Sequence, residues 1–348
     1  MESIGAVHKL ALFYIDKMEV GEEFKQRFWK DIYGYSQNEI IPELIKHDLI
    51  TEGFDLNSSL NSMKISEIKE ILRHNGLKVS GNKGELIERI QGNADLIDLS
   101  NLPKFYVLTE KGKDIKSHSR YIQYFHKNVH DIDIFRVNNF YKKYPSLTSD
   151  EVIENILMDK VNDNLKKKEY FSASYYSDRL AYFYSEKDYF EKGISQILFS
   201  MIYSVLQEYR YEELNGNLRG IDKKHSGIIG YNKDLQIKFK SYLDKHNINR
   251  PDAHRMISDV VYSINYDFAN ADDVSEIILY ALEGKDDEIN KVFYSRIIEK
   301  ERSSTNHTNT IKNTGDNMKN SGCLNSGCLT FITLPTITII YSLTQFIF

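Results

Sequence analysis

The stretch GLKVSGNKGELIERI, residues 76–90, is the most informative part of the sequence about local structure. Two of its three glycines, Gly76 and Gly81, lie five positions apart with a lysine close behind, and this spacing invites comparison with a phosphate-binding loop. Such a loop needs lysine directly after the second glycine, then serine or threonine, and an apolar strand before the first glycine. Here Asn82 separates Gly81 from Lys83, and the preceding SEIKEILRHN has the periodicity of an amphipathic helix. The stretch is therefore not a nucleotide-binding loop.

The same residues predict two helices joined by a short extended link. Gly76 is suited to end the first helix, because glycine adopts positive φ without strain. Ser80 is a good N-cap for the second helix. The apolar residues expected to face inward are Ile65, Ile68, Ile71, Leu72, Leu77, Val79, Leu86, Ile87 and Ile90. Together they predict a helix–extended–helix hairpin with a small core of its own.

Residues 60–90, LNSMKISEIKEILRHNGLKVSGNKGELIERI, resemble the SAP domain, a helix–extended–helix module of chromatin, DNA-repair, bacterial and phage proteins that binds DNA. The positions that carry the resemblance are Ile65, Ile68, Lys69, Gly76, Leu77, Ser80, Gly81, Lys83, Glu85, Leu86, Ile87 and Arg89. Gly84 departs from the pattern, because a better helix former is usual there, and it slightly weakens the second helix. The resemblance covers about a tenth of the chain but nearly all of the motif.

This resemblance implies binding of double-stranded DNA through backbone N–H groups at the start of the second helix, with basic side chains on the phosphates. The residues themselves favour the same site, since the N-terminus of a helix attracts anions. The candidate DNA-binding residues are Lys69, Arg73, Lys78, Ser80, Gly81, Asn82, Lys83 and Arg89. A second interpretation stays open. Six basic residues and four acidic ones lie between positions 59 and 93, so the hairpin could be a solvated surface used for protein contact.

The segments on either side of the hairpin have a less specific resemblance. IIPELIKHDLI before it and FYVLTEKGKDI after it are similar to the second helix and the wing of a winged-helix domain. We expect a strand over residues 104–112 that closes in a turn. The lysines that would then add charge beside the hairpin are Lys104, Lys111, Lys113 and Lys116. The alternative is a plain packing hairpin that supports the SAP-like unit.

The rest of the chain is predicted to be mainly α-helical. The expected domains are an N-terminal helical region (1–58), the hairpin (59–93), a strand and turn connector (94–119), a helical domain resembling an α-solenoid (120–302), a flexible linker (303–328) and an apolar segment (329–348). We expect the helical domain to bind protein partners, and an adaptor built on it is the alternative to a DNA-binding protein.

No motif in the sequence indicates catalysis or a cofactor. His126 and His130 lie four apart, a spacing that can place two metal ligands on one helix face, but no third ligand is suitably spaced. We therefore expect no metal, no cofactor and no enzyme activity. A nucleic-acid-processing enzyme with a site in 120–302 that no motif marks is the other alternative.

The last 20 residues, 329–348, carry no charge. A helix of that length spans about 30 Å, the thickness of a bilayer's apolar core, so we expect a membrane anchor. Lys312 and Lys319 favour a cytoplasmic position for the preceding part. The net charge of −5 confines any nucleic-acid site to a local patch, and both cysteines lie in the linker. The sequence thus predicts a cytoplasmic DNA-binding protein of bacterial or phage origin that tethers DNA at a membrane.

Overall fold

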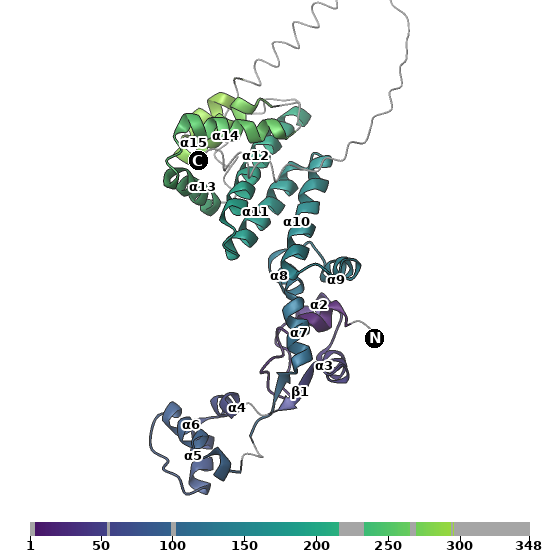
Figure 1. Ribbon diagram of the computed structural model, residues 1–348, viewed down its shortest axis with the longest axis vertical. Helices are drawn as coiled ribbons and strands as arrows, with labels where there is room; N and C mark the ends of the chain where they lie inside the picture. Colours follow the sequence, from purple (N-terminus) through teal and green to yellow (C-terminus); the bar gives the residue numbers. More distant parts are fainter. Residues whose placement is uncertain are drawn as a thin grey trace, which may run out of the picture. The chain divides into compact units, whose positions relative to one another are not determined.

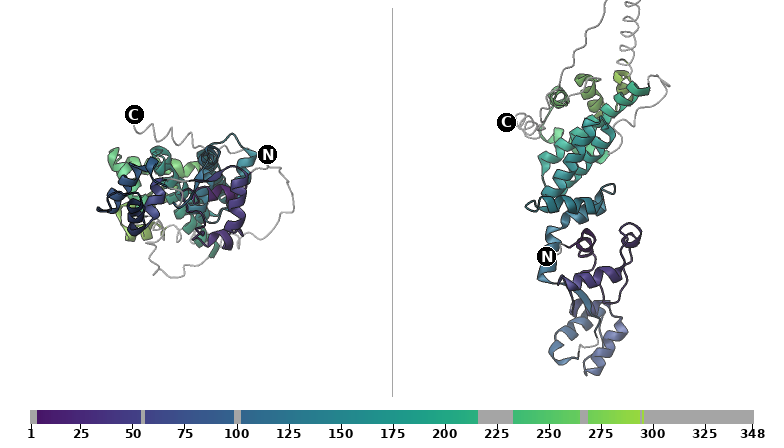
Figure 2. Two further views of the ribbon diagram at one scale, coloured as in Figure 1. Left: turned by 90° about the horizontal axis from the view of Figure 1, so that it is seen from below. Right: turned by 90° about the vertical axis from the view of Figure 1, so that its right-hand side faces the viewer.

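The computed structural model describes residues 4–53, 56–98, 102–215, 233–264, 269–293 and Ser295. These residues divide into two compact units, Met1–Ile156 and Leu157–Phe348 (Figure 1). Helices make up most of the ribbon in both views of Figure 2, and the predicted mainly α fold is confirmed. The division falls at residue 156 rather than at residue 120, because α8 (Arg120–Asn128) and α9 (Ile134–Lys143) pack against α1 (Ala6–Ala11).

The first unit is built around a short antiparallel sheet. Strand β1 (Ile50–Gly53) pairs with β2 (Phe105–Leu108), Ile50 opposite Leu108. On the other side of β2, residues 17–20 run along the strand, and Tyr106 exchanges backbone hydrogen bonds of 2.9 Å with Lys17 and Met18. Helices α2 (Phe28–Asp31) and α3 (Gln37–Lys46) precede β1. A capping box between Ser36 and Glu39 starts α3, with the Ser36 N–H donating to the Glu39 carboxylate at 2.7 Å.

The hairpin is an insertion between these two strands. Its two helices are α5 (Ile65–His74) and α6 (Lys83–Gln91), and the inserted segment also contains α4 (Leu56–Ser62) before them and a short 3-10 helix (Ala94–Leu96) after them. Since β1 leads into it and β2 leads out of it, the hairpin occupies the place of the turn that joins the two strands.

The connector after β2 differs from the expected strand and turn. The strand ends at Leu108, and Glu110–His118 form helix α7. The Thr109 hydroxyl accepts a 3.0 Å hydrogen bond from the Gly112 N–H and so caps this helix. Gly112 itself is buried so tightly that a Cβ atom there would collide with the Leu49 carbonyl. The prediction was wrong because Glu-Lys-Gly, which often closes a turn, here forms the first turn of a capped helix.

A half-buried lysine lies where α8 and α9 cover α1. The Lys9 ammonium donates to the Asn138 side chain at 2.9 Å and to the Tyr121 hydroxyl at 3.1 Å, and it lies 5.0 Å from the centre of the Tyr141 ring. No carboxylate is among these partners. Desolvation by burial, with a smaller effect of nearby Lys142, lowers the pKa of Lys9 to about 8.

The second unit consists of helices packed on one another. The long helices α11 (Tyr170–Glu186) and α12 (Phe190–Asn215) lie side by side, and Ser174 on α11 donates to the Ser200 carbonyl of α12 at 3.0 Å. Helices α14 (Arg250–Ser263) and α15 (Ala271–Glu283) form a second pair, and α13 (Lys233–Lys245) packs against α12 and α15. Helix α10 (Ser149–Lys166) spans the point where the chain divides.

The predicted linker, 303–328, and the predicted anchor, 329–348, lie outside the described residues. Within the described ranges, no helix combines the length and the apolar character needed to cross a bilayer.

Candidate nucleic-acid interface

The hairpin has its own apolar core. The residues that form it are Leu60, Ile68, Leu72, Leu86, Ile87, Ile90, Ile97 and Leu102. Ile65 was predicted to face inward, but it is 45% exposed because it is the first residue of α5, beyond the reach of α6. Sequence periodicity missed the contributions of α4 and of Ile97, which close the core from both ends of the hairpin. This core fixes α6 relative to the link that leads into it.

Gly76 ends α5 as predicted. It has φ +67°, and its N–H donates to the Arg73 carbonyl at 3.1 Å. The next N–H, that of Leu77, donates to the Leu72 carbonyl at 2.8 Å. These two bonds and the packing of Leu77 on the core form a Schellman motif, which satisfies the last carbonyls of the helix. The motif turns the chain directly into the extended link.

The start of α6 differs from the prediction in its cap. Asn82, not Ser80, is the N-cap: its side chain accepts from the Glu85 N–H at 3.1 Å, and the Glu85 carboxylate accepts from the Asn82 N–H at 3.0 Å. Glycine at position 81 leaves room for the Glu85 carboxylate to reach the Asn82 N–H. Its φ is +130°, and a Cβ atom there would collide with that carboxylate. The helix therefore begins two residues later than Ser80 would allow.

This cap determines which backbone donors face solvent. The Asn82 N–H, predicted to be free, is occupied by Glu85. The N–H groups of Lys83 and Gly84, in the first turn of α6, donate to no acceptor in the part of the chain that the structure describes. The partial positive charge of a helix N-terminus is concentrated on such groups. Ser80 and Gly81 lie exposed beside them, so the donors available to an anion centre on Lys83 and Gly84.

Two of the predicted basic residues hold the hairpin together. The Arg89 guanidinium donates to the carbonyls of Lys78 and Ser80, at 2.5 and 3.1 Å, and so fastens the link to α6. The Lys83 ammonium donates to the Asn61 carbonyl at 2.7 Å, near the end of α4. Both cations therefore have a structural partner, and a substitution at either one would disturb the hairpin as well as any ligand.

The remaining predicted cations lie at the surface without a partner. Arg73 and Lys78 are exposed, Lys69 is half-buried, and none of the three makes a hydrogen bond or ion pair within the described ranges. Lys69 and Arg73 share one side of α5, because they are four residues apart. Of the acidic residues nearby, Glu67 and Glu85 are turned toward the N–H groups of Lys64 and Asn82. Capping thus engages two carboxylates, while three cations stay available.

The lysines of the flanking segment are mostly used internally. The Lys111 ammonium donates to the His47 carbonyl at 2.8 Å, Lys113 pairs with Glu110 at 2.7 Å, and Lys116 pairs with Asp16 at 3.2 Å. Lys104 is exposed. Lys111 and Lys116 therefore fasten α7 to neighbouring segments, and Lys113 is paired within α7, so three of the four lysines expected beside the hairpin have internal partners.

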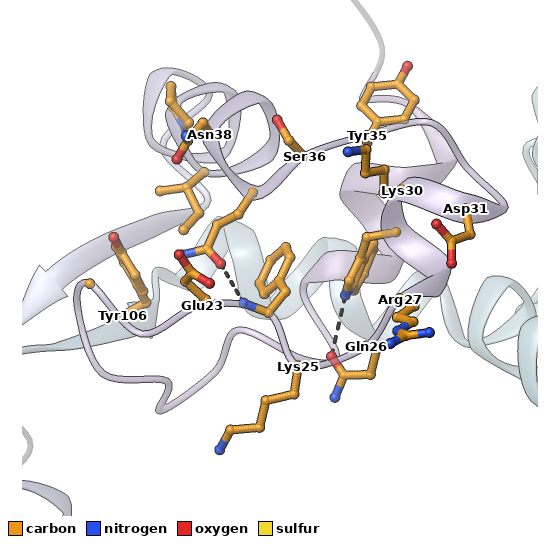
Figure 3. Close-up of a pocket in the computed structure, with 16 residues that line it drawn as sticks. Glu23, Lys25, Gln26, Arg27, Lys30, Asp31, Tyr35, Ser36, Asn38 and Tyr106 are labelled. Carbon is orange, nitrogen blue, oxygen red and sulfur yellow. Dashed lines mark hydrogen bonds between the residues drawn. The ribbon is translucent and has the colours of Figure 1, made fainter.

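Helix α3 and the groove beside it present mixed chemistry. The groove, of about 950 Å³, is lined by Phe24, Trp29 and the start of α3 (Figure 3). The Gln37 side-chain carbonyl accepts from the Phe24 N–H at 2.6 Å, so the polar lining holds the preceding loop against the helix. The exposed side of α3 combines acidic Glu39 with apolar Ile45. The groove lining also mixes charges, with Lys25, Arg27 and Lys30 beside Glu23 and Asp31.

His126, the first residue of the histidine pair, lies among aromatic side chains. His126 Nδ1 lies 2.6 Å from the Tyr33 hydroxyl, within an aromatic cluster that includes Phe28. Desolvation by burial, with smaller effects of His130 and Lys127, lowers the pKa of His126. In the described residues no group of three histidine, cysteine, aspartate or glutamate side chains is placed to hold a metal ion.

Comparison with known proteins bears on the hairpin alone. The family model of the SAP domain matches residues 59–93. No curated protein and no solved structure matches the chain. The matched range contains α5, the Schellman turn at Gly76, the extended link and the capped start of α6. Residues 59–93 are therefore a SAP domain, inserted between β1 and β2, and its presence indicates nucleic-acid binding.

Proposed function

We propose that this chain is a non-enzymatic protein that binds duplex DNA through its SAP domain. The observation that carries the proposal is the start of α6, where the free N–H groups of Lys83 and Gly84 lie at the positive end of the helix dipole. The exposed side chains of Lys78, on the link, and Arg73, on α5, and the half-buried Lys69 supply positive charge in the same domain. Phosphate oxygens are the groups that this combination recognises.

The absence of aromatic side chains favours duplex over single-stranded DNA. Residues 59–93 contain no phenylalanine, tyrosine or tryptophan. Proteins that bind single strands typically stack the unpaired bases on aromatic rings. A site without such rings can hold the phosphates of a duplex but offers no platform for splayed bases. With few phosphate contacts, we expect micromolar or weaker affinity near physiological salt and little preference for sequence.

Fluorescence anisotropy of labelled duplexes tests this proposal. The full-length chain is titrated against several unrelated duplexes over a range of salt concentrations. Substituting Arg73→Gln and Lys78→Gln together should weaken binding to every duplex about 10-fold and flatten the slope of log K against log salt by about 2. The matched control, Lys233→Gln with Lys240→Gln on α13, removes the same charge elsewhere and should leave binding unchanged. Equal binding by the parent and the SAP-domain variant would refute the proposal.

We propose further that residues 329–348 tether the chain, and with it the bound DNA, at a membrane. The support is the uncharged sequence LTFITLPTITIIYSLTQFIF, which has the length of a bilayer-spanning helix. Full-length protein should sediment with membranes and carry duplex DNA with it, whereas a chain ending at residue 302 should bind DNA without sedimenting. Full-length protein that stays in the supernatant without detergent would refute the tether and leave the DNA-binding proposal intact.

A further inference from the structure

Positive charge is concentrated on two consecutive helices outside the SAP domain. Helices α8 and α9 contain no aspartate or glutamate, although the whole chain has a net charge of −5. Their basic residues are Arg120, Lys127, Arg136, Lys142 and Lys143. All five are exposed, and none makes a hydrogen bond or ion pair to another described residue.

The outward side of α8 carries a regular stripe of donors. Arg120, Gln123 and Lys127 follow one another at spacings of three and four residues, which places them on one side of the helix. The buried residues of α8 are Tyr121, Ile122 and Phe125. At 100° per residue the mean direction of the stripe is opposite to that of the buried residues. The packing of Tyr121, Ile122 and Phe125 therefore fixes the stripe toward solvent.

Helix α9 repeats the arrangement. Arg136, Asn139 and Lys143 are spaced by three and four residues, opposite the buried Ile134, Val137 and Asn138. Each stripe thus consists of an arginine, a side-chain amide and a lysine, with no apolar or acidic member. Because α8 and α9 pack against each other and both pack on α1, the two stripes belong to one rigid part of the first unit. We call these six residues the α8–α9 stripes.

An ordinary solvated helix surface mixes charges of both signs. Helix α10, which follows directly, does so: it has five acidic and two basic residues, and Lys166 lies 3.8 Å from Asp163. Such pairs neutralise each other along a helix. The α8–α9 stripes contain no acidic residue. The two carboxylates between the helices are those of Asp131 and of Asp133, which caps α9 through the Phe135 N–H, so the stripes themselves carry an excess of positive charge that an anionic partner can neutralise.

We propose that the α8–α9 stripes are a second nucleic-acid-binding surface, separate from the SAP domain, that holds the phosphate backbone without reading sequence. Arginine and lysine bind phosphate as charge-assisted donors, and glutamine and asparagine add neutral donors to phosphate or sugar oxygens. The arginine and lysine of each stripe are seven residues apart, about 10 Å along the helix, so they reach separate phosphates. That α8 and α9 present an exposed basic surface is inferred from these two helices alone. Only the assignment of that surface to nucleic acid rests on the proposed function.

The composition of the stripes argues against two other anionic partners. A helix that lies on an anionic membrane inserts an apolar side into the lipid, but the apolar sides of α8 and α9 are buried against α1 and each other. The centre of a protein–protein interface is enriched in aromatic residues and depleted of lysine, and neither stripe contains an aromatic residue. A phosphate backbone requires only the donors that are present.

The test measures duplex binding by the full-length chain in anisotropy titrations over a range of salt concentrations. The variant Arg120→Gln, Lys127→Gln, Arg136→Gln, Lys143→Gln should bind about 10- to 100-fold more weakly at about 0.1 M salt, with the salt slope flatter by about 3 to 4. A matched control removes four exposed lysines of α13, Lys233, Lys238, Lys240 and Lys245, and should keep the parent's slope. Arg120→Lys with Arg136→Lys keeps the charge at the same positions and should also keep the slope, which separates lost charge from lost folding.

The outcomes distinguish this surface from the SAP domain. Unchanged affinity and slope in the quadruple variant, with binding still lost in Arg73→Gln, Lys78→Gln, would overturn the second surface and leave the SAP proposal standing. Binding lost only in the quadruple variant would support the second surface and refute the SAP proposal. Vesicles containing phosphatidylserine serve as the competing partner. If the quadruple substitution abolishes vesicle binding but not duplex binding, the stripes bind lipid and the inference is wrong.

Discussion

Gly81 is the residue on which the geometry of the SAP-domain site depends most. It has φ +130°, a region that residues with a side chain rarely adopt, and a Cβ atom would collide with the carboxylate of Glu85. That carboxylate accepts from the Asn82 N–H and closes the capping box of α6. The substitution Gly81→Ala therefore strains the backbone and displaces the cap at the same time.

The magnitude follows from these two effects. A residue held in a sparsely populated backbone region costs about 1–3 kcal/mol, and loss of a helix cap costs about 1 kcal/mol. Gly81→Ala should thus destabilise the hairpin by about 2–4 kcal/mol. Gly84→Ala is the matched control, because it makes the same change three residues later within α6, where a Cβ atom would meet only the Asn82 side-chain oxygen, at 3.3 Å. Its effect should stay within about 0.5 kcal/mol, since the gain in helix propensity offsets this contact.

Amide hydrogen exchange of the full-length chain measures the difference. In Gly81→Ala the amides of α5 and α6 should exchange about 30-fold faster or more, because local opening becomes easier. In Gly84→Ala they should exchange at nearly the parent rate. If both variants exchange at the parent rate, the backbone at Gly81 does not have the conformation described and the argument for the capped start of α6 fails.

Three further substitutions test other parts of the structure. Gly76→Val should accelerate amide exchange across α5 and α6, since a β-branched residue at φ +67° costs about 1–2 kcal/mol or more. Gly76→Asn should be tolerated, and equal exchange rates in the two variants would contradict the Schellman turn. Gly112→Ala should lower the urea midpoint of the first unit, because a Cβ atom collides with the Leu49 carbonyl and overpacking costs about 1–3 kcal/mol. Unfolding is monitored by the fluorescence of Trp29, the single tryptophan, and a midpoint equal to the parent's would show that α7 lies farther from β1. Between pH 8 and 10.5 the unfolded chain retains the Lys9 proton that the folded chain has released, so the free energy of unfolding should rise with pH. Lys9→Met should reduce that rise by about 1–2 kcal/mol, after allowance for the exposed part of the side chain. An equal rise in parent and variant would show that Lys9 is not desolvated.

Local signals predicted the hairpin because its structure depends on local chemistry. Gly76 followed by apolar Leu77 indicates a Schellman turn, and the spacing of Ile68, Leu72, Leu86 and Ile90 identifies the core. The cap was misassigned although a signal was present. Ser80 has lysine three residues later, whereas Asn82 has Glu85, which is the capping-box spacing.

Tertiary contacts account for the other errors. The sequence identifies Lys83 and Arg89 as cations but cannot show that backbone carbonyls of Asn61, Lys78 and Ser80 lie within their reach. Helix α7 was missed because the close approach of Gly112 to β1 depends on how two distant segments pack. The lack of acidic residues in α8 and α9 was visible in the sequence, but only the buried residues of each helix show which side carries the donors.

Site-specific photo-crosslinking tests whether bound DNA lies at the start of α6. A photoreactive phenylalanine analogue is placed at Ser80, beside the free N–H groups of α6, or at Gln91, the exposed last residue of the same helix and about 12 Å farther along it. With duplex DNA bound to the full-length chain, we expect a crosslink from position 80 and little or none from position 91. A crosslink from position 91 alone, or from neither position while anisotropy shows binding, would contradict the assignment of DNA binding to the start of α6.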